Sequence, residues 1–171
     1  MMSILLNYLP FPYVIIVSIA AVVFAAMGME AVAWSLHKYV MHQFGWVLHE
    51  DHHRPSKSRF QKNDMYAIFF AILSIILIII GIRIYGLLFW LGIGVTLYGI
   101  GYVVFHDILF HKRIKNNYHP KKGYMKRIFN AHTYHHVTTN KKGSHGQAYG
   151  FIYASKKYTP LLQDLLAKKN K

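Results

Sequence analysis

The residues most suited to chemistry in this chain are its histidines, of which there are 12. Most fall into the segments "HKYVMH", "HEDHH", "HDILFH" and "HTYHH", so an HxxxxH spacing followed by HxxHH occurs twice. Neutral imidazole is a common metal ligand, whereas clustered imidazolium ions repel one another. The repeated pattern therefore predicts metal binding. The clustered histidines are His37, His42, His49, His52, His53, His106, His111, His132, His135 and His136.

Helical geometry accounts for one of the two spacings. Residues i, i+3 and i+4 share a helix face, so the three histidines of each HxxHH segment can converge on one point. Residues i and i+5 lie about 140° apart on a regular helix. The HxxxxH segments at 37–42 and 106–111 therefore predict a helix end, a local π-helical turn, or ligands that approach from different sides.

Setting aside His119 and His145, ten of the 12 histidines are clustered, and a metal ion commonly takes about four to six ligands. Two metal ions are therefore expected. Imidazole suits iron, zinc and copper, and the absence of cysteine excludes thiolate ligands. Glu50, Asp51 and Asp107 could hydrogen-bond to the outer ring N–H groups, or they could be solvated charges and helix caps. His119 and His145 adjoin turn residues and are expected in surface loops.

The elements that must position these histidines are long and apolar. A membrane-spanning helix needs about 20 apolar residues, and spans are expected at about residues 11–34, 65–82 and 84–105. Only Arg83 separates the second and third spans, which predicts a tight turn between them. A fourth, short or interfacial helix could lie at 124–129 or 161–166. The predicted fold is an all-α integral membrane protein with a histidine-rich helical cap that holds two metals.

The length of 171 residues predicts a single domain spanning 1–171, and the charge distribution predicts its orientation in the membrane. All Lys and Arg residues except Arg83 would lie on one side, which is the cytoplasmic side by the positive-inside rule. The N-terminus would then lie outside the cytoplasm. Metal-binding segments 37–64 and 106–155 and the basic tail 156–171 would lie on the cytoplasmic side of the membrane. The first apolar segment lacks a basic leader and exceeds a signal-peptide core, so it is expected to be retained.

The net charge of +14 raises the question of nucleic-acid binding. The basic residues adjoin the apolar spans, where they fix topology and contact anionic lipid. No basic groove interleaved with aromatic residues is evident, so a nucleic-acid partner is not expected. In the third span, Gly92, Gly94, Gly99 and Gly101 are expected to permit close approach between helices.

Longer segments carry a family resemblance. The segments "GMEAVAWSLHKYVMHQFGWVLHEDHHRP", "FHDILFHKR" and "KGYMKRIFNAHTYHHVTTNKKGSHGQAYGFIYA" closely resemble bacterial β-carotene hydroxylases, which belong to the fatty acid hydroxylase and sterol desaturase superfamily. The resemblance covers about residues 26–155. The histidine pattern is shared across the superfamily, whereas "GME", "HKYVMH", "HEDHHRP" and "NDMYA" are similar to the carotenoid type.

The resemblance implies a diiron, oxygen-dependent monooxygenase that hydroxylates carbon 3 of the β-ionone rings, converting β-carotene through β-cryptoxanthin into zeaxanthin. Electrons would come from NADPH through ferredoxin and its reductase, and the carotenoid would arrive from the bilayer. All ten clustered histidines would be iron ligands, although zinc can also occupy such sites. His119 and His145 are not part of the family pattern. The loop at 137–151 departs from the more common acidic, glycine-rich version.

Two classes of alternative remain open from the sequence. A ketolase, desaturase or fatty acid hydroxylase could use the same scaffold, and its product would distinguish it. A metal transporter or metal sensor would need ionisable ligands near the middle of the bilayer. Every clustered histidine lies at or beyond the end of a predicted span, which favours an enzyme.

Overall fold

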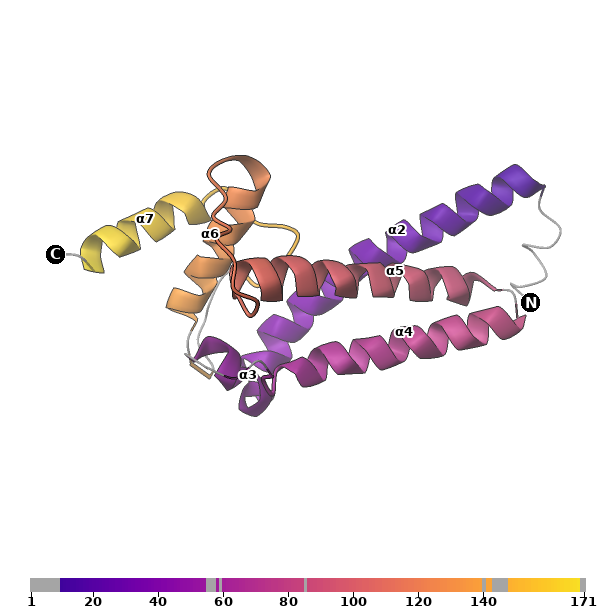
Figure 1. Ribbon diagram of the computed structural model, residues 1–171, viewed down its shortest axis with the longest axis horizontal. Coiled ribbons are helices and arrows are strands. Elements are labelled where there is room, and N and C mark those ends of the chain that lie inside the picture. The colour runs from indigo at the N-terminus through magenta and orange to yellow at the C-terminus, as the bar shows by residue number, and fades with distance from the viewer. Residues whose placement is uncertain are drawn as a thin grey trace. The chain divides into compact units, whose positions relative to one another are not determined.

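The structure, a computed structural model, describes residues 10–54, 58, 60–84, 86–139, 141–142 and 148–169. Every element in this part of the chain is helical, which confirms the predicted all-α class. The helices are α2 (Phe11–Leu36), α3 (Trp46–His53), α4 (Asp64–Ile84), α5 (Leu87–Gly101), α6 (Gly123–Thr138) and α7 (Tyr158–Lys169), as Figure 1 shows. Two π-helices, His37–Met41 and Tyr102–Phe110, continue α2 and α5 respectively.

Three helical stretches are long and apolar enough to cross a membrane: Phe11–Met41, Asp64–Arg83 and Leu87–Phe110. The three predicted spans are therefore confirmed. The first and third run past residues 34 and 105 because the π-helices prolong them. Large apolar side chains such as Phe24 and Phe69 are 75% and 61% exposed. Exposed apolar surface on this scale is unfavourable in water and suits a lipid environment.

The chain divides into two compact units. The first contains Met1–Met29 and Met65–Tyr102. Within it α4 and α5 run antiparallel, and the turn between them closes with a hydrogen bond from the Gly86 N–H to the Gly81 carbonyl (3.1 Å; Figure 1). The tight turn predicted at Arg83 is thus confirmed.

Two glycines of α5 allow close helix packing in this unit. A Cβ atom on Gly92 would lie 2.8 Å from Cγ1 of Ile78 in α4, and one on Gly94 would lie 2.7 Å from Cβ of Ala25 in α2. Added Cβ atoms on Gly99 and Gly101 would meet nothing within 4 Å. The predicted role in helix packing is therefore confirmed for Gly92 and Gly94 but not for the other two.

This difference predicts the effect of two matched substitutions. We expect Gly94→Ala to push α5 away from α2 and to lower the free energy of unfolding by about 1–3 kcal/mol, the usual cost of overpacking. Gly99→Ala places the same methyl group in open space and improves helix propensity, so we expect no loss. Thermal unfolding midpoints of both variants in one detergent measure the difference. Equal midpoints would contradict the proposed packing role of Gly94.

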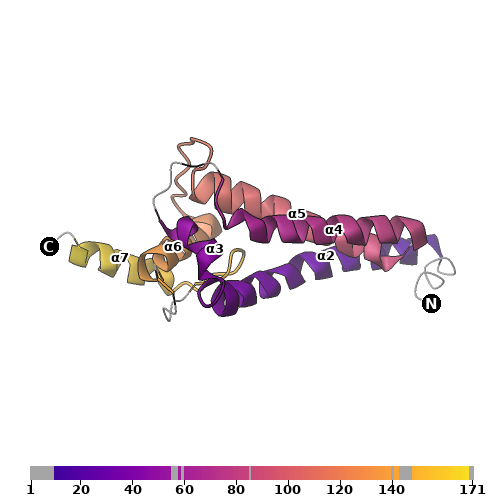
Figure 2. The ribbon, with the colours of Figure 1, turned by 90° about the horizontal axis from the view of Figure 1, so that it is seen from below.

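The second unit contains Glu30–Asp64 and Val103–Lys171, and it includes every clustered histidine. Its apolar core is built from Phe110, Ile128, Ala131 and Ala154. Ile128 and Ala131 face this core from α6, and α7 packs on α6 (Figure 2). Both candidate short helices, at 124–129 and 161–166, lie within α6 and α7. Their placement at a membrane surface stays a prediction.

The π-helices resolve the awkward HxxxxH spacing. The His42 N–H donates to the His37 carbonyl (3.2 Å), and the His111 N–H donates to the His106 carbonyl (2.9 Å). These i→i+5 bonds replace the usual i→i+4 bonds and place the second histidine of each pair above the first. The irregularity predicted at both HxxxxH segments is confirmed.

Candidate metal centre

The ten clustered histidines lie in the second unit as two sets of five imidazole rings. The first set, called group one here, has ring nitrogens that lie within 4.8 Å of one another. It draws on the first π-helix, the turn that follows this helix at His42, α3 and α6. Group one consists of His37, His42, His49, His53 and His135.

Group two is made of two overlapping triads that share His111. The first triad joins His111 to His52 and His136, and the second joins it to His106 and His132, each with ring nitrogens within 4.8 Å. Each HxxHH segment is therefore divided between the groups and does not converge on one point. On a helix, positions i+3 and i+4 point about 100° apart, so one segment can serve two neighbouring sites.

Hydrogen bonds fix the orientation of two rings of group one, those of His37 and His49. His37 donates its Nδ1 proton to the Tyr149 carbonyl oxygen (2.9 Å), and His49 donates its Nδ1 proton to Oδ1 of Asn63 (2.6 Å). A neutral imidazole carries one proton, so each Nε2 atom presents a lone pair. The two Nε2 atoms lie 3.1 Å apart, and Nε2 of His53 lies 3.1 Å from that of His49.

Two lone pairs at this separation need a positive charge between them. Protonation of a ring is opposed, because burial, followed by the charge of a protonated His37, lowers the pKa of His42 to about 3. Burial is also the main reason that the pKa of His49 falls to about 3, although its bond to Asn63 acts in the opposite direction. Adjacent nitrogen ligands of one metal ion stand about 3.0–3.4 Å apart when each bond is about 2.1 Å long. The nitrogens of group one thus fit a bound cation.

Group two is oriented by a different set of acceptors. His52 donates from Nδ1 to Oε1 of Gln61 (3.3 Å), and His106 donates from Nδ1 to Oδ1 of Asp107 (2.8 Å). The Nε2 atoms of His132 and His111 lie 2.8 Å apart. Nε2 of His136 is buried and has no hydrogen-bond partner among the described residues. Such inward lone pairs are again suited to a metal ion.

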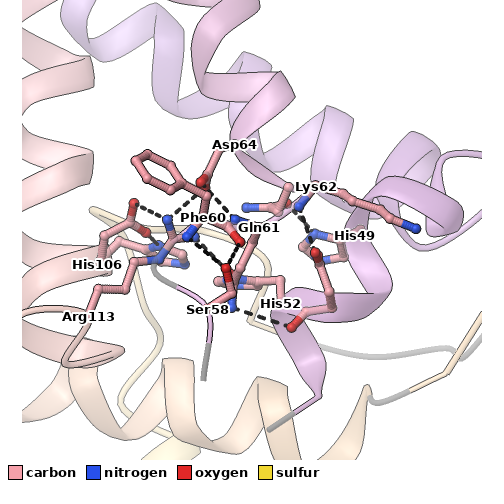
Figure 3. Close-up of polar contacts among 12 residues, drawn as sticks. His49, His52, Ser58, Phe60, Gln61, Lys62, Asp64, His106 and Arg113 are labelled. Carbon is pink, nitrogen blue, oxygen red and sulfur yellow. Dashed lines mark hydrogen bonds and ion pairs between the residues drawn. The ribbon is translucent and has the colours of Figure 1, made fainter. Parts of the chain in front are cut away.

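Arg113 links the acceptors of group two, and its contacts with Gln61 and Asp64 can be followed in Figure 3. Its guanidinium donates to Oε1 of Gln61 and to Oδ1 of Asp64, each at 2.7 Å, and lies 3.6 Å from Oδ2 of Asp107. Because arginine is only a donor, this contact identifies the Gln61 atom as oxygen. His52 must then carry its proton on Nδ1. One side chain thereby fixes the acceptors of both His52 and His106.

The three acids near the histidines have different surroundings. Asp107 accepts the Nδ1 proton of His106. Glu50 forms an exposed ion pair with Arg54 (3.0 Å). Asp51 accepts the backbone N–H of Lys62 at 2.6 Å and so holds the segment that carries Gln61 and Asn63. A role for Glu50 or Asp51 beside a metal ion stays a prediction.

Aromatic rings cover both groups. The Trp46 ring lies 5.4 Å from that of His42 and 5.5 Å from that of His53. The Phe110 ring lies 5.5 Å from that of His132. These rings limit the access of water and lower the local dielectric constant, which favours neutral imidazole.

Of the two histidines outside the clusters, His119 is described by the structure and joins neither group. His119 is exposed in a non-helical segment, as expected, and accepts a hydrogen bond from Nζ of Lys112 (3.0 Å). His145 lies outside the described residues.

Sequence reasoning missed the neutral acceptors of the outer ring nitrogens. Asn63 and Gln61 follow the first HxxHH segment in "QKND", and Tyr149 acts through its backbone carbonyl. A backbone carbonyl leaves no mark in residue type. The position of two amides between a histidine segment and an apolar span was the only available signal for Gln61 and Asn63.

The bond from His49 to Asn63 gives a direct test of orientation. We expect Asn63→Leu to leave the buried Nδ1 proton of His49 unpaired and to weaken metal binding or activity by about 10–100-fold. Asn63→Asp keeps an acceptor oxygen on a side chain of the same length. This variant is expected to retain most of the metal binding and most of the activity. Metal titration of the two purified variants measures the effect, and equal behaviour would argue against this orienting bond.

Comparisons with known proteins show which sequences this chain is similar to. The sequence model of the fatty acid hydroxylase family matches residues 22–154. The chain is 46% identical over 136 residues to a beta-carotene hydroxylase of Pantoea ananas, covering 79% of this chain and 77% of that protein. It is 41% identical over 135 residues to a beta-carotene hydroxylase of Pseudescherichia vulneris, with 79% and 76% covered.

Plant proteins are similar over a shorter region. The chain is 39% identical over 116 residues to the chloroplastic beta-carotene hydroxylase 1 of Capsicum annuum, which covers 66% of this chain and 37% of that protein. No solved structure matches the chain. The family match extends from α2 to the segment after Tyr149 and includes every clustered histidine. This membrane protein, with its histidine-rich helical metal centre, therefore belongs to the fatty acid hydroxylase family.

Proposed function

We propose that the protein is a diiron, oxygen-dependent monooxygenase that hydroxylates carbon 3 of the β-ionone rings of β-carotene, giving β-cryptoxanthin and then zeaxanthin. The observation that carries the proposal is the pair of five-histidine groups with inward lone pairs. The proposed substrate is the one for which the similar proteins of Pantoea ananas and Capsicum annuum are named. All ten clustered histidines are the proposed iron ligands, five to each iron.

The donor set fits iron, since imidazole suits iron and the described residues of both groups offer nitrogen alone. Bound iron would supply the activation of molecular oxygen that an unactivated ring C–H bond requires. The chain's own part is to keep the ring nitrogens deprotonated and aimed inward. Asn63, Gln61, Asp107 and the Tyr149 carbonyl do this by accepting the outer protons.

The remaining parts of the proposal concern surroundings and partners. The carotenoid would enter from the bilayer, and electrons would come from NADPH through ferredoxin and ferredoxin reductase. The metal centre would face the cytoplasm of a bacterial cell and the N-terminus would lie outside, as the basic residues favour. The whole chain would act as one membrane hydroxylase domain.

Expression in β-carotene-accumulating bacteria tests the reaction. We expect hydroxylated pigment, first the mono- and then the dihydroxy product, identified by chromatography and mass. His52→Ala removes a ligand of group two and should abolish the product. Ketone products would instead indicate a ketolase, and unchanged β-carotene with oxidation of another lipid would indicate a different substrate.

A further inference from the structure

Glu30 is an acidic side chain within the first apolar helix, and the proposed reaction gives it no role. Its Oε1 atom accepts backbone N–H bonds from Phe151 (2.9 Å), Ile152 (2.8 Å) and Tyr153 (3.0 Å). Ionisable groups in apolar spans are costly and usually have a specific partner. Three N–H groups directed at one carboxylate oxygen form a small anion-binding nest. The contact joins α2 to a segment more than 100 residues later.

The nest depends on a glycine. A Cβ atom at Gly150 would lie 2.9 Å from Oε1 of Glu30 and 2.7 Å from the Tyr153 carbonyl oxygen. A side chain there would displace the carboxylate or the loop. The chain also turns at Ala148, which has a positive φ of 63°. The loop 148–153 is thus shaped to receive this carboxylate.

The same loop contacts the metal centre. The carbonyl of Tyr149 accepts the Nδ1 proton of His37, and the Tyr149 ring lies 5.3 Å from the His37 ring and 5.1 Å from the His135 ring. The Phe151 ring lies 6.4 Å from that of His106 in group two. Tyr149 therefore stands two residues from the first N–H that Glu30 holds.

We propose that Glu30 is a positioning residue for group one: it clamps the 151–153 backbone and thereby holds the Tyr149 carbonyl where it accepts the outer proton of His37. The Nε2 lone pair of His37 is then directed at the metal position. The effect on metal binding rests on the proposed function, because it requires that His37 be a ligand. The effect on which ring nitrogen of His37 carries the proton does not depend on the proposed function.

The test compares purified wild-type protein with Glu30→Gln, Glu30→Leu, Gly150→Ala and the double variant Glu30→Leu/Gly150→Ala. Asp164→Asn is the control variant: it also removes a carboxylate, but from an exposed position of α7. Each protein is loaded with iron-57, and iron per chain and the Mössbauer spectrum are recorded. Histidine nitrogen NMR on the metal-free proteins reports whether Nδ1 of His37 carries the proton.

We expect Glu30→Leu and Gly150→Ala each to lose about half of the bound iron, together with one set of Mössbauer lines, and to reduce the Nδ1-protonated fraction of His37. The double variant should be no worse than either single variant, because both break one contact. Glu30→Gln keeps an acceptor oxygen and should be intermediate, and Asp164→Asn should match wild type. If Glu30→Leu fails to fold, Glu30→Gln and Gly150→Ala still test whether Glu30 positions His37.

Wild-type iron content, spectrum and His37 protonation in Glu30→Leu and Gly150→Ala would overturn the proposal. So would additive losses in the double variant. If wild-type protein binds no iron, the proposed function fails by itself. The NMR comparison then decides whether Glu30 positions His37.

Discussion

Replacing His135 by alanine is expected to reduce hydroxylation by more than about 100-fold and to remove the metal ion of group one. His135 is fully buried, and its Nε2 atom lies 3.2 Å from Nε2 of His42. Loss of groups that merely orient ligands costs about 10–100-fold, so loss of a ligand itself should cost more. Metal analysis and pigment formation measure the two effects.

His119→Ala is the matched control, because it also removes one imidazole. His119 is exposed, and its ring accepts a hydrogen bond from Lys112, which lies outside both groups. This variant should keep wild-type metal content and activity. If His135→Ala retained its metal and its activity, the assignment of group one as a metal site would be wrong.

The metal-free protein is expected to lose stability steeply as the pH falls below about 6.5. Burial is the largest cause that lowers the pKa of His42 and of His49, each to about 3, and it also lowers the pKa of His52 and His135. In the unfolded chain the same groups take up protons near their ordinary pKa of about 6.5. Below that pH the unfolded state binds more protons than the folded state, so the free energy of unfolding decreases.

The sign and slope of this dependence are specific. The stabilising contribution is fully present above about pH 6.5 and is lost as the pH falls toward 3, the folded-state value for His42 and His49. Each such histidine contributes about 1.4 kcal/mol per pH unit in this range. Thermal unfolding midpoints of the metal-free protein between pH 8 and pH 5 provide the measurement. A flat profile would show that these rings are not held neutral by burial.

Bound metal should oppose this loss, because a ligand that binds only the folded state stabilises it. Since protons compete with the metal for the same lone pairs, the protection should weaken at lower pH. Comparison of loaded and metal-free protein at each pH separates metal binding from proton uptake.

The sequence predicted the parts of the structure that depend on residue type and period. Long apolar runs specify helices in lipid, because every backbone polar group must be satisfied within the helix. The i, i+5 spacing of His37 and His42 conflicts with a regular helix, and that conflict correctly predicted the π-helices. Both inferences rest on geometry within one segment.

The interactions that cross between distant segments were beyond the sequence. The division of His52 from His49 and His53 depends on where other helices place their rings. Likewise, nothing in the spacing of Glu30 and Tyr153 indicates that they meet. Such contacts depend on the three-dimensional path of the chain, which a single sequence without its relatives does not encode locally.

The π-helical turns also bear on how the spacing between histidines can vary. A π-turn contains one residue more than the α-turn it replaces, and it absorbs that residue locally. Deleting one residue from "KYVM" would let the helix close as an ordinary α-turn and still stack the two imidazoles on one side. A protein with one residue fewer between these histidines could therefore keep the same ligand pair. A difference of one residue in this spacing alone does not indicate a different metal site.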